Sequence, residues 1–344
     1  MRNSKIIVSK DSVSGKRPAA SAGKKAATRI VVAVYGADTR IGNKLVAMLK
    51  ANNLGVLPRP TQWAIGKQSD VIRADVAAKQ PAIICNCLID PDSGDLPIAE
   101  TSAYVTVTQA LVSAAKQQGC RYVHCSSARI YGPGDKPDQG NSYTEYDTVL
   151  VKGDDPWRSL VAATERAVMY QTLLANPVAA RTSNIDFSFY VLRFGHVISF
   201  EESRSQRFPA VHTLSACLLA AKQTSKTFVC DNPDRLISPI TSTFAATCVT
   251  DVCNAACPAP YGFYNIGSSE PTTLREMCSR VSLRSGVFTS FAASTPRHSD
   301  WRVYGVDANQ SVNSDWWVSR GMRAVPRWQA AIRDLMRDSD LCAV

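Results

Sequence analysis

The chain has 344 residues, of which 45% are hydrophobic and 20% charged, as is usual for a globular protein. This length allows two domains of ordinary size, or one α/β domain with a smaller lobe. No apolar run approaches the ~18 residues that a membrane-spanning helix needs, so we expect no membrane span.

The net charge of +10 is concentrated in residues 1–29, which carry +7 and leave only +3 for the remaining chain. This basic tail is rich in Ser, Ala and Lys, and we expect it to be disordered in isolation. It fits a mitochondrial targeting segment, a segment for nuclear import or for binding RNA or another polyanion, or a solvated tail. The first interpretation predicts a mitochondrial protein and the others a cytoplasmic or nuclear one. No aromatic residue is interleaved with its cations, so base stacking by the tail is not indicated.

A continuous apolar run ends at Gly36, and an amphipathic segment begins at Gly42. This is the strand–turn–helix context of a dinucleotide-binding turn, in which the helix start presents N–H groups to a pyrophosphate. Thr39 stands where a middle glycine would let the phosphate approach. Asp38 adds a negative charge that Arg40 offsets in part. The turn is therefore either a dinucleotide cradle or only the first crossover of an α/β sheet.

Further strands are expected at 54–57, 71–76, 82–87, 121–127 and 187–194, and long helices at 98–118 and 156–174. Strands that alternate with helices at this spacing predict an α/β fold with a parallel, doubly wound sheet. The alternation loosens after residue 195. We therefore predict a tail over 1–29, a Rossmann dinucleotide-binding domain over 30–195, and a smaller C-terminal α/β substrate-type lobe over 196–344, part of which returns to the sheet.

Eleven cysteines are present, without a C-x-x-C pair and without histidines at ligand spacing. We therefore predict buried free thiols in a reducing compartment and no metal site.

Seven segments carry a family resemblance, and in chain order they are Gly36 with Gly42, Asp75-Val76, Asn86-Cys87, the run 127–132 (SARIYG), Leu192-Arg193, the run 262–267 (GFYNIG), and Arg297 to Asp300 with Asp307. In these the chain resembles the extended short-chain dehydrogenase/reductases, the NAD-dependent epimerase/dehydratase family, over about residues 30–335. Within that family it is most similar to the 4-dehydrorhamnose reductase-like branch, which includes the regulatory β subunit of methionine adenosyltransferase.

The resemblance implies a dinucleotide held by Gly36, Thr39, Arg40, Ile41, Gly42, Arg59, Asp75, Val76, Asn86 and Cys87. In the family the Asp75-Val76 position contacts adenine. Arg59 replaces an acidic residue that would hold the ribose of NAD, and a guanidinium there suits the 2′-phosphate of NADP(H). Arg59 is otherwise a surface residue between two prolines, and with Thr39 and Asp38 in the loop, cofactor binding stays open.

The family's chemistry needs a Tyr-x-x-x-Lys pair on the second long helix, in which the lysine lowers the pKa of the tyrosine. Glu165 matches the glutamate that follows this pair, which puts Val161 at the lysine and Trp157 at the tyrosine. A register shifted by three residues puts Thr164 and Leu160 there instead. Neither register restores the pair, and no tyrosine in the chain is followed four residues later by lysine. Only Ser127, the family's hydrogen-bonding serine, remains, and we predict a catalytically silent protein.

Three functions follow from these patterns. The first is a structural or regulatory subunit of a larger, mitochondrial assembly. The second is an active NADP(H)-dependent sugar-nucleotide epimerase, dehydratase or reductase with relocated catalytic groups, for which Tyr143 and Tyr146 qualify only if their loop folds inward. The third is an RNA- or ribosome-associated protein that uses the tail. The resemblance also implies a homodimer, or docking of another protein, through the helices near 98–118 and 157–174.

Overall fold

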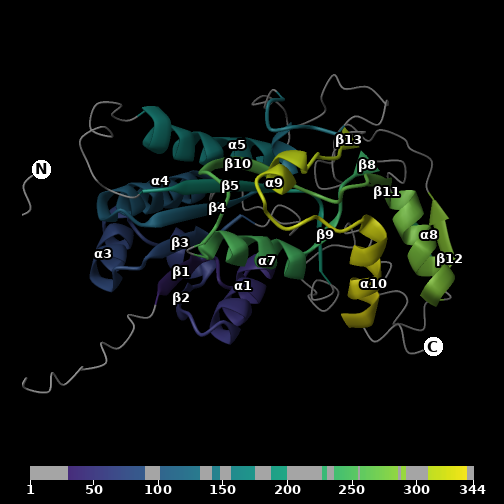
Figure 1. Cartoon of the computed structure of the whole chain (residues 1–344), viewed down its shortest axis with the longest axis horizontal. Helices are drawn as coiled ribbons and strands as arrows, with labels where there is room; N and C mark the ends of the chain where they lie inside the picture. The colour runs from purple at the N-terminus through teal and green to yellow at the C-terminus, as the bar shows by residue number, and fades with distance from the viewer. Residues whose placement is uncertain are drawn as a thin grey trace, which may run out of the picture.

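Six parallel strands form the central sheet of the computed structural model, in the order β10-β5-β4-β3-β1-β2 (Figure 1). The structure describes residues 30–89, 101–131, 142–147, 156–174, 187–199, 227–230, 236–254, 256–285, 288–291 and 309–338. The strands are β1 Val31–Tyr35, β2 Gly55–Arg59, β3 Ile83–Asn86, β4 Arg121–Ser127, β5 Phe189–Phe194 and β10 Gly262–Ile266. Most are continuous apolar runs because helices cover both faces.

Helices α3 Ser69–Lys79, α4 Thr101–Gln118 and α5 Pro156–Met169 lie on one face, and α1 Arg40–Ala51 and α7 Ser242–Cys253 on the other (Figure 1). Successive side chains of a strand point to opposite faces. Tyr122 of β4 accordingly lies in the core beneath α4 and α5, while Val123 lies in the core beneath α1 and α7. The predicted doubly wound α/β fold is confirmed.

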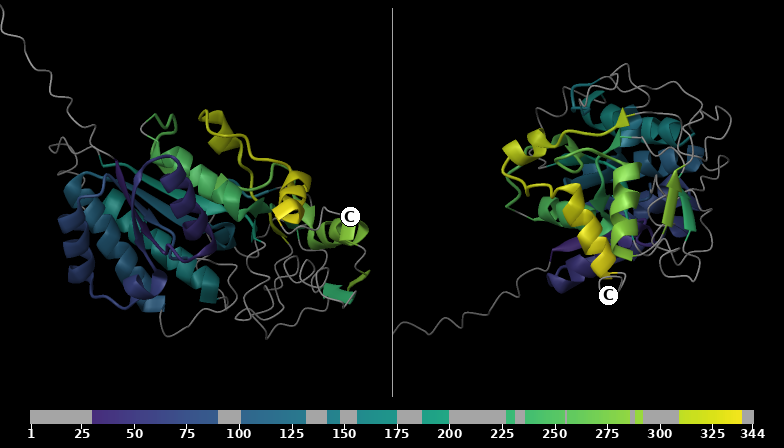
Figure 2. Two further views of the ribbon diagram at one scale, coloured as in Figure 1. Left: turned by 90° about the horizontal axis from the view of Figure 1, so that it is seen from below. Right: turned by 90° about the vertical axis from the view of Figure 1, so that its right-hand side faces the viewer.

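A smaller lobe lies beyond the carboxyl ends of the strands (Figure 2). Its elements are β6 Val197–Ile198, β7 Thr227–Cys230, β8 Leu236–Ile237, β9 Ile240–Thr241, β11 Thr272–Thr273, α8 Leu274–Ser285, β12 Phe288–Phe291, β13 Asn309–Gln310, α9 Asp315–Ser319 and α10 Trp328–Asp338. Two elements that follow residue 195, α7 and β10, belong to the main sheet layers. Within the described residues, no helix is long and apolar enough to cross a membrane.

One element prediction is wrong. Residues 71–76, expected as a strand, are part of helix α3, in which Ile72 and Val76 are buried one turn apart. Residues 30–89 are all described, and no strand lies between β2 and β3 in them. Strand β2 is therefore an edge strand, which explains why it tolerates Pro58.

Smaller differences concern element ends. Strand β2 continues through Arg59 rather than ending at residue 57, and α1 begins at Arg40 rather than at Gly42. Three short helical segments complete the described elements. They are the α-helix α2 Thr61–Ile65 after β2, the 3-10 helix η2 Ala128–Tyr131 after β4, and the π-helix η3 Tyr170–Leu174 after α5.

Candidate functional site

The glycines of the β1–α1 loop are required by close packing. Gly36 has a φ of +80°, and a Cβ there would lie 2.5 Å from the carbonyl oxygen of Cys87. A Cβ on Gly42 would lie 1.9 Å from the carbonyl oxygen of Gly36. Any larger side chain would therefore push the loop, the helix and β3 apart.

Thr39 fills the middle-glycine position and is the N-cap of α1. Its Oγ1 accepts a hydrogen bond from Gly42 N at 3.1 Å and lies 2.8 Å from the carbonyl oxygen of Gly36 and 3.0 Å from that of Cys87. The hydroxyl therefore faces inward, where it joins the loop, the helix start and β3. The positive end of the α1 dipole still faces the carboxyl edge of the sheet.

The two charged loop residues have separate partners. Asp38 Oδ1 accepts hydrogen bonds from Thr61 N at 2.6 Å and from Thr61 Oγ1 at 2.8 Å, which ties the loop to the start of α2. The buried Arg40 donates from Nη1 to the carbonyl oxygen of Val197 at 2.9 Å and so joins α1 to β6. Asp38 thus fixes the β1–α1 loop to α2, and Arg40 fixes the start of α1 to β6.

Arg59 is held by a carboxylate. Its Nη2 lies 2.6 Å from Asp75 Oδ1 and its Nε 3.0 Å from Oδ2, while its guanidinium lies 5.0 Å from the ring centre of Trp63. Tyr35 donates its hydroxyl to Asp75 at 3.2 Å, and burial together with that carboxylate raises the pKa of Tyr35 above its usual value. A 2′-phosphate at Arg59 would meet the negative charge of Asp75.

The expected Asp75-Val76 pair does not follow a strand, because both residues lie on α3. The Val76 side chain is buried in the core beneath α4. The expectation that Asp75 and Val76 end a strand is therefore wrong, and their contact with adenine stays a prediction. Asp75 instead fixes α3 to the edge of the sheet, through its contacts with Arg59.

Asn86 ends β3 with its side chain satisfied inside the protein. Its Nδ2 donates to Thr108 Oγ1 at 3.1 Å and to Tyr122 OH at 3.0 Å, and its Oδ1 accepts from Leu88 N at 3.2 Å. The Asn86 amide thus lies between the sheet and α4. Cys87 presents its carbonyl oxygen to Thr39.

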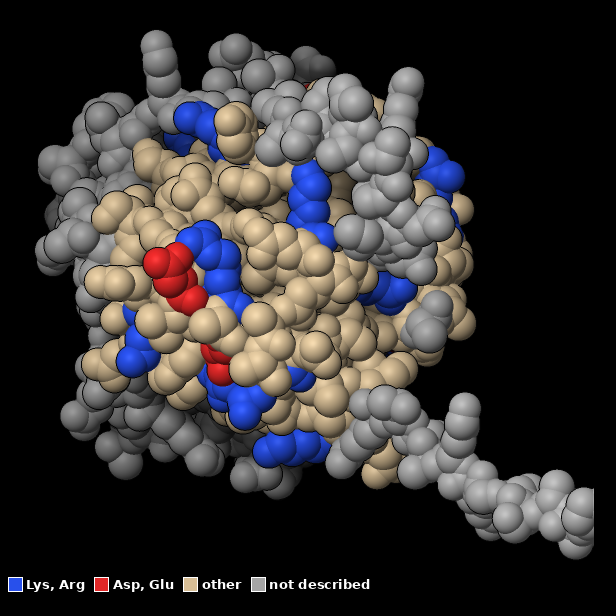
Figure 3. All heavy atoms as spheres, turned by 90° about the vertical axis from the view of Figure 1, so that its left-hand side faces the viewer, with Lys and Arg blue, Asp and Glu red and all other residues tan. Residues whose placement is uncertain are grey.

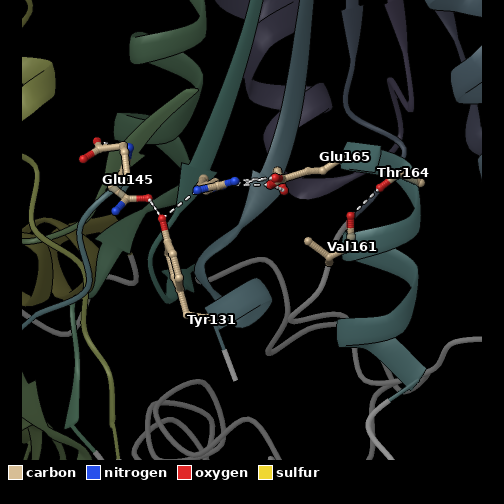
Figure 4. A network of polar contacts seen from close by, with 8 residues as sticks. Tyr131, Glu145, Val161, Thr164 and Glu165 are labelled. Carbon is tan, nitrogen blue, oxygen red and sulfur yellow. Dashed lines mark hydrogen bonds and ion pairs between the residues drawn. The ribbon is translucent and has the colours of Figure 1, made fainter. Parts of the chain in front are cut away.

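The orientation of α5 is fixed by a buried ion pair. Arg193 Nη2 lies 2.7 Å from Glu165 Oε2, and Ser126 donates its hydroxyl to the same carboxylate (Figure 4). Positions one and two turns earlier on this face hold Val161, which is 0% exposed, and Trp157, which is 4% exposed. In the register that the sequence predicts from Glu165, these are the positions expected for the lysine and the tyrosine of the Tyr-x-x-x-Lys pair.

The alternative register offers no pair either. Leu160 is apolar and fully buried. The Thr164 hydroxyl donates within its own helix, where the carbonyl oxygen of Leu160 lies at 3.1 Å and that of Val161 at 3.0 Å. Figure 4 shows the contact with Val161. The Oγ of Ser127 accepts from Arg129 N at 3.2 Å and shapes the η2 turn.

The nearby tyrosines are placed for packing. Tyr131 donates to Asn265 Oδ1 at 2.8 Å and accepts from Arg193 Nη1 at 2.8 Å, and its ring stacks on Tyr143 at 4.9 Å. Burial raises the pKa of Tyr131 to about 12, opposite to the shift that proton exchange near neutral pH requires. Tyr146 is 80% exposed, so its ring does not fold inward.

Sequence reasoning did not find this polar network, which joins Glu165, Arg193, Tyr131 and Asn265 (Figure 4). Each of the last three residues lies in a segment that carries the family resemblance, and that was the only available signal. The segment from Arg297 to Asp300, with Asp307, lies outside the described residues, as does the tail. Within the described part of the chain, no group of three or more His, Cys, Asp or Glu side chains could hold a metal ion.

The β1–α1 loop suits the pyrophosphate at the centre of a dinucleotide, whereas the adenosine and nicotinamide ends find less support. The two glycines and the start of α1 suit a pyrophosphate, because they let backbone approach and offer a positive dipole end. The Tyr-x-x-x-Lys pair that the resemblance implies beside the nicotinamide is missing from the sequence, since no tyrosine is followed four residues later by lysine. At the adenosine end the Arg59–Asp75 pair is neutral as a whole, so it offers a 2′-phosphate no net attraction.

The comparisons with known proteins agree with this fold. The dTDP-4-dehydrorhamnose reductase of Clostridium acetobutylicum is 15% identical, with a TM-score of 0.68, over 90% of this chain and 99% of that one. The Yersinia enterocolitica reductase is 14% identical, with a TM-score of 0.69, over 91% and 100%. The UDP-glucose 4-epimerase of Thermus thermophilus, solved with NAD, is 18% identical, with a TM-score of 0.67, over 89% and 99%.

No curated protein matches the sequence. The solved structures therefore establish the fold, and the family rests on a match to more than half of the chain. That match is to the model of the NAD dependent epimerase/dehydratase family and covers residues 32–213. It contains the glycine cradle, the Ser127 turn and the Glu165–Arg193 pair, and the chain belongs to this family.

Proposed function

We propose that this chain is a catalytically silent member of its family that serves as a structural or regulatory subunit of a larger assembly. The observation that carries the proposal is the pair of buried apolar side chains, Trp157 and Val161, on the face of α5 that Glu165 fixes. An indole N–H is too weak an acid to act as a general acid near neutral pH, and Val161 has no charge with which to lower a neighbour's pKa. Losing a proton-transfer group costs about 10²–10⁴-fold in rate, or roughly 3–5 kcal/mol.

A dinucleotide would be a bound ligand of this subunit and not a reactant. The backbone of Gly36 and the start of α1 support binding of the pyrophosphate. A Bacillus anthracis dTDP-4-dehydrorhamnose reductase of the same fold was solved with NADP, and the Thermus thermophilus epimerase with NAD. A ligand that binds only the folded chain raises its stability in proportion to the logarithm of its concentration.

The outward faces of α4 and α5 support a protein partner. Exposed positions there include Ser102, Thr106 and Gln109 on α4, none of which is charged, while α5 presents Ser159 and the charged Arg166. Interface cores are depleted of charge, as these positions of α4 are. We propose this face for a second copy or another subunit, with mitochondrial import through residues 1–29.

The test is an assay of the purified full-length chain with UDP-glucose and with a dTDP-4-keto sugar, each with NADH and with NADPH. We expect no turnover, and a nucleotide-dependent rise in the unfolding temperature. Turnover that disappears in Ser127→Ala but persists in Lys67→Ala, a change at an exposed side chain, would overturn the proposal. Size measurement of the same samples, with Gln109→Arg as a disrupting variant, tests self-association through α4.

A further inference from the structure

Cysteine side chains meet in pairs on the face of the sheet that α1 and α7 cover. Cys85 of β3 and Cys253 of α7 have their sulfur atoms 3.5 Å apart, and those of Cys87 and Cys125 are 3.4 Å apart. All four thiols are free and buried. We propose that Cys85 and Cys253 are a site of oxidative modification, at which a hydroperoxide converts the two thiols into a disulfide bond that locks α7 to the sheet. The proposal goes beyond the silent-subunit function and does not depend on it.

The Cys85 and Cys253 sulfur atoms are already aimed at each other, since each is the hydrogen-bond partner of the other. A disulfide bond is about 2.05 Å long, so these sulfurs need to approach by about 1.5 Å. Rotation of the two side chains and a small movement of the helix end can supply that approach. The two residues are 168 positions apart in the sequence, so the bond would close a long loop and restrict the unfolded chain.

The end of α7 is the route by which an oxidant reaches this pair. Cys85 is 0% exposed and Cys253 is 2% exposed, so a peroxide does not reach either sulfur while the helix end is closed. Cys253 is, however, the last residue of α7, and the following Asn254 is exposed. Helix ends open locally at a far lower cost than the whole fold. Cys253 is therefore the thiol that meets the oxidant, and Cys85 is the thiol that completes the bond.

Arg121, the first residue of β4, holds this helix end closed. Its Nη1 donates to the carbonyl oxygen of Val252 and, at 2.8 Å, to that of Asn254. The last carbonyl groups of a helix have no partner inside the helix, so these two contacts fix the end of α7 against the sheet. Arg121 thus controls how often the last turn opens, and with it the rate of oxidation.

The closed structure protects the pair, and the open one favours reaction. The thiolate is the nucleophile in thiol oxidation. The hydrogen bond with Cys253, together with burial, raises the pKa of the Cys85 thiol above its usual value, and opening of the last turn removes both causes. Figure 3 views the side of the molecule on which the strands begin and α7 ends, and its visible charged side chains are mostly Lys and Arg. Such surroundings favour the thiolate of an exposed Cys253.

The oxidation balances with one hydroperoxide for each pair. The Cys253 sulfur attacks one oxygen of hydrogen peroxide, the O–O bond breaks and water leaves, which gives a sulfenic acid. The Cys85 sulfur then attacks the Cys253 sulfur, the S–O bond breaks, and a second water leaves as the disulfide forms. The two thiols thus lose two electrons and two protons, which the peroxide takes up as two molecules of water.

The test exposes the folded, reduced full-length chain to hydrogen peroxide, blocks the remaining thiols, and identifies linked peptides by mass spectrometry without reduction. We expect a linked pair that joins Cys85 to Cys253 and that dithiothreitol separates. The linked chain should unfold at a temperature roughly 5 °C higher than the reduced chain, because the bond restricts the unfolded state. Cys85 and Cys253 that stay free under these conditions, or that link without a shift of the unfolding temperature, would overturn the proposal.

Cys87 and Cys125 provide a matched control, because their sulfurs are equally close but lie two residues further along the sheet from the end of α7. Cys87→Ala/Cys125→Ala should form the Cys85–Cys253 bond at an unchanged rate, and Cys253→Ala should not form it. Faster linkage of Cys87 to Cys125 in the unchanged chain would overturn the role of the helix end. The half-buried Cys257 is the second control, since loss of the bond in Cys257→Ala would make that thiol the reactive one and overturn the proposal.

The rate of linkage tests the route through the end of α7. Arg121→Lys keeps the positive charge but not the two contacts of one guanidinium nitrogen, so it should speed formation of the bond about five-fold, as the loss of one hydrogen bond would. Arg73→Lys changes an arginine that pairs with Asp70 on the exposed face of α3, and it should leave the rate unchanged. Equal rates in Arg121→Lys and the unchanged chain would overturn the proposed route.

Discussion

Glu165 and Arg193 form an ion pair of 2.7 Å whose side chains are only 2% and 5% exposed. The pair joins α5 to β5, and through Tyr131 it reaches Asn265 of β10. Both charges have been removed from water. Removal of either partner would therefore leave the other charge buried and uncompensated, which would destabilise the folded chain. The pair thus fixes which face of α5 meets the sheet, and on that face lie the buried Trp157 and Val161, which we propose to occupy the places of the family's phenol and ammonium.

Glu165→Ala should reduce the free energy of unfolding by about 3–5 kcal/mol, because Arg193 is left buried without its carboxylate. Urea unfolding of the variant measures this. The double variant Glu165→Leu/Arg193→Met should be more stable than the single one, since it removes both charges. A loss below about 1 kcal/mol in the single variant would show that the pair has no such role.

Asp75→Asn should increase the affinity for NADPH roughly ten-fold, because it frees the Arg59 guanidinium for a charge-assisted hydrogen bond to the 2′-phosphate. NADH affinity should not change. Calorimetric titration of both nucleotides measures the effect, and the double variant Arg59→Ala/Asp75→Asn is the control that should lose the gain. Equal gains for NADH and NADPH would show that Arg59 does not lie at the adenosine ribose.

Sequence patterns predicted those parts of the fold that depend on a short stretch of the chain. Strands such as β4 were predictable because a buried parallel strand is a short apolar run between turns. The glycines at 36 and 42 were predictable because the turn needs them within seven residues. The prediction of a strand over residues 71–76 was wrong because Val71 and Ile72 form a strand-like apolar pair in the sequence. In the structure both residues lie on helix α3, where Val71 is 45% exposed.

Long-range contacts in the site were beyond sequence reasoning. Arg59 and Asp75 are 16 residues apart, and Tyr131 and Asn265 are 134 apart. No periodicity encodes which of these side chains meet. The exposed Tyr261 beside Phe189 was unpredictable for the same reason, since its surroundings arise only when β10 joins β5.

Thr39→Ala should destabilise the chain by about 1 kcal/mol through loss of the N-cap, whereas Thr39→Gly should cost only a few tenths. The two variants separate capping from nucleotide access. Thr39→Gly restores the middle glycine, so it should show the larger rise in unfolding temperature with NADH. An identical rise in both variants would mean that the Thr39 side chain does not limit access of the pyrophosphate.

His124 should make stability depend on pH. Burial in β4 lowers the pKa of His124 from 6.5 to about 4, against a smaller opposing influence of Glu165. Since the unfolded chain takes up the proton first, stability should be complete above pH 6.5 and fall by about 3 kcal/mol as the pH drops to 4. Glu145, whose pKa is raised by burial, acts in the opposite sense, so the comparison must isolate the histidine. Urea unfolding of His124→Gln between these pH values should show a flatter dependence than the unchanged chain, whatever its absolute stability, and an equal slope in both proteins would place the titrating group elsewhere.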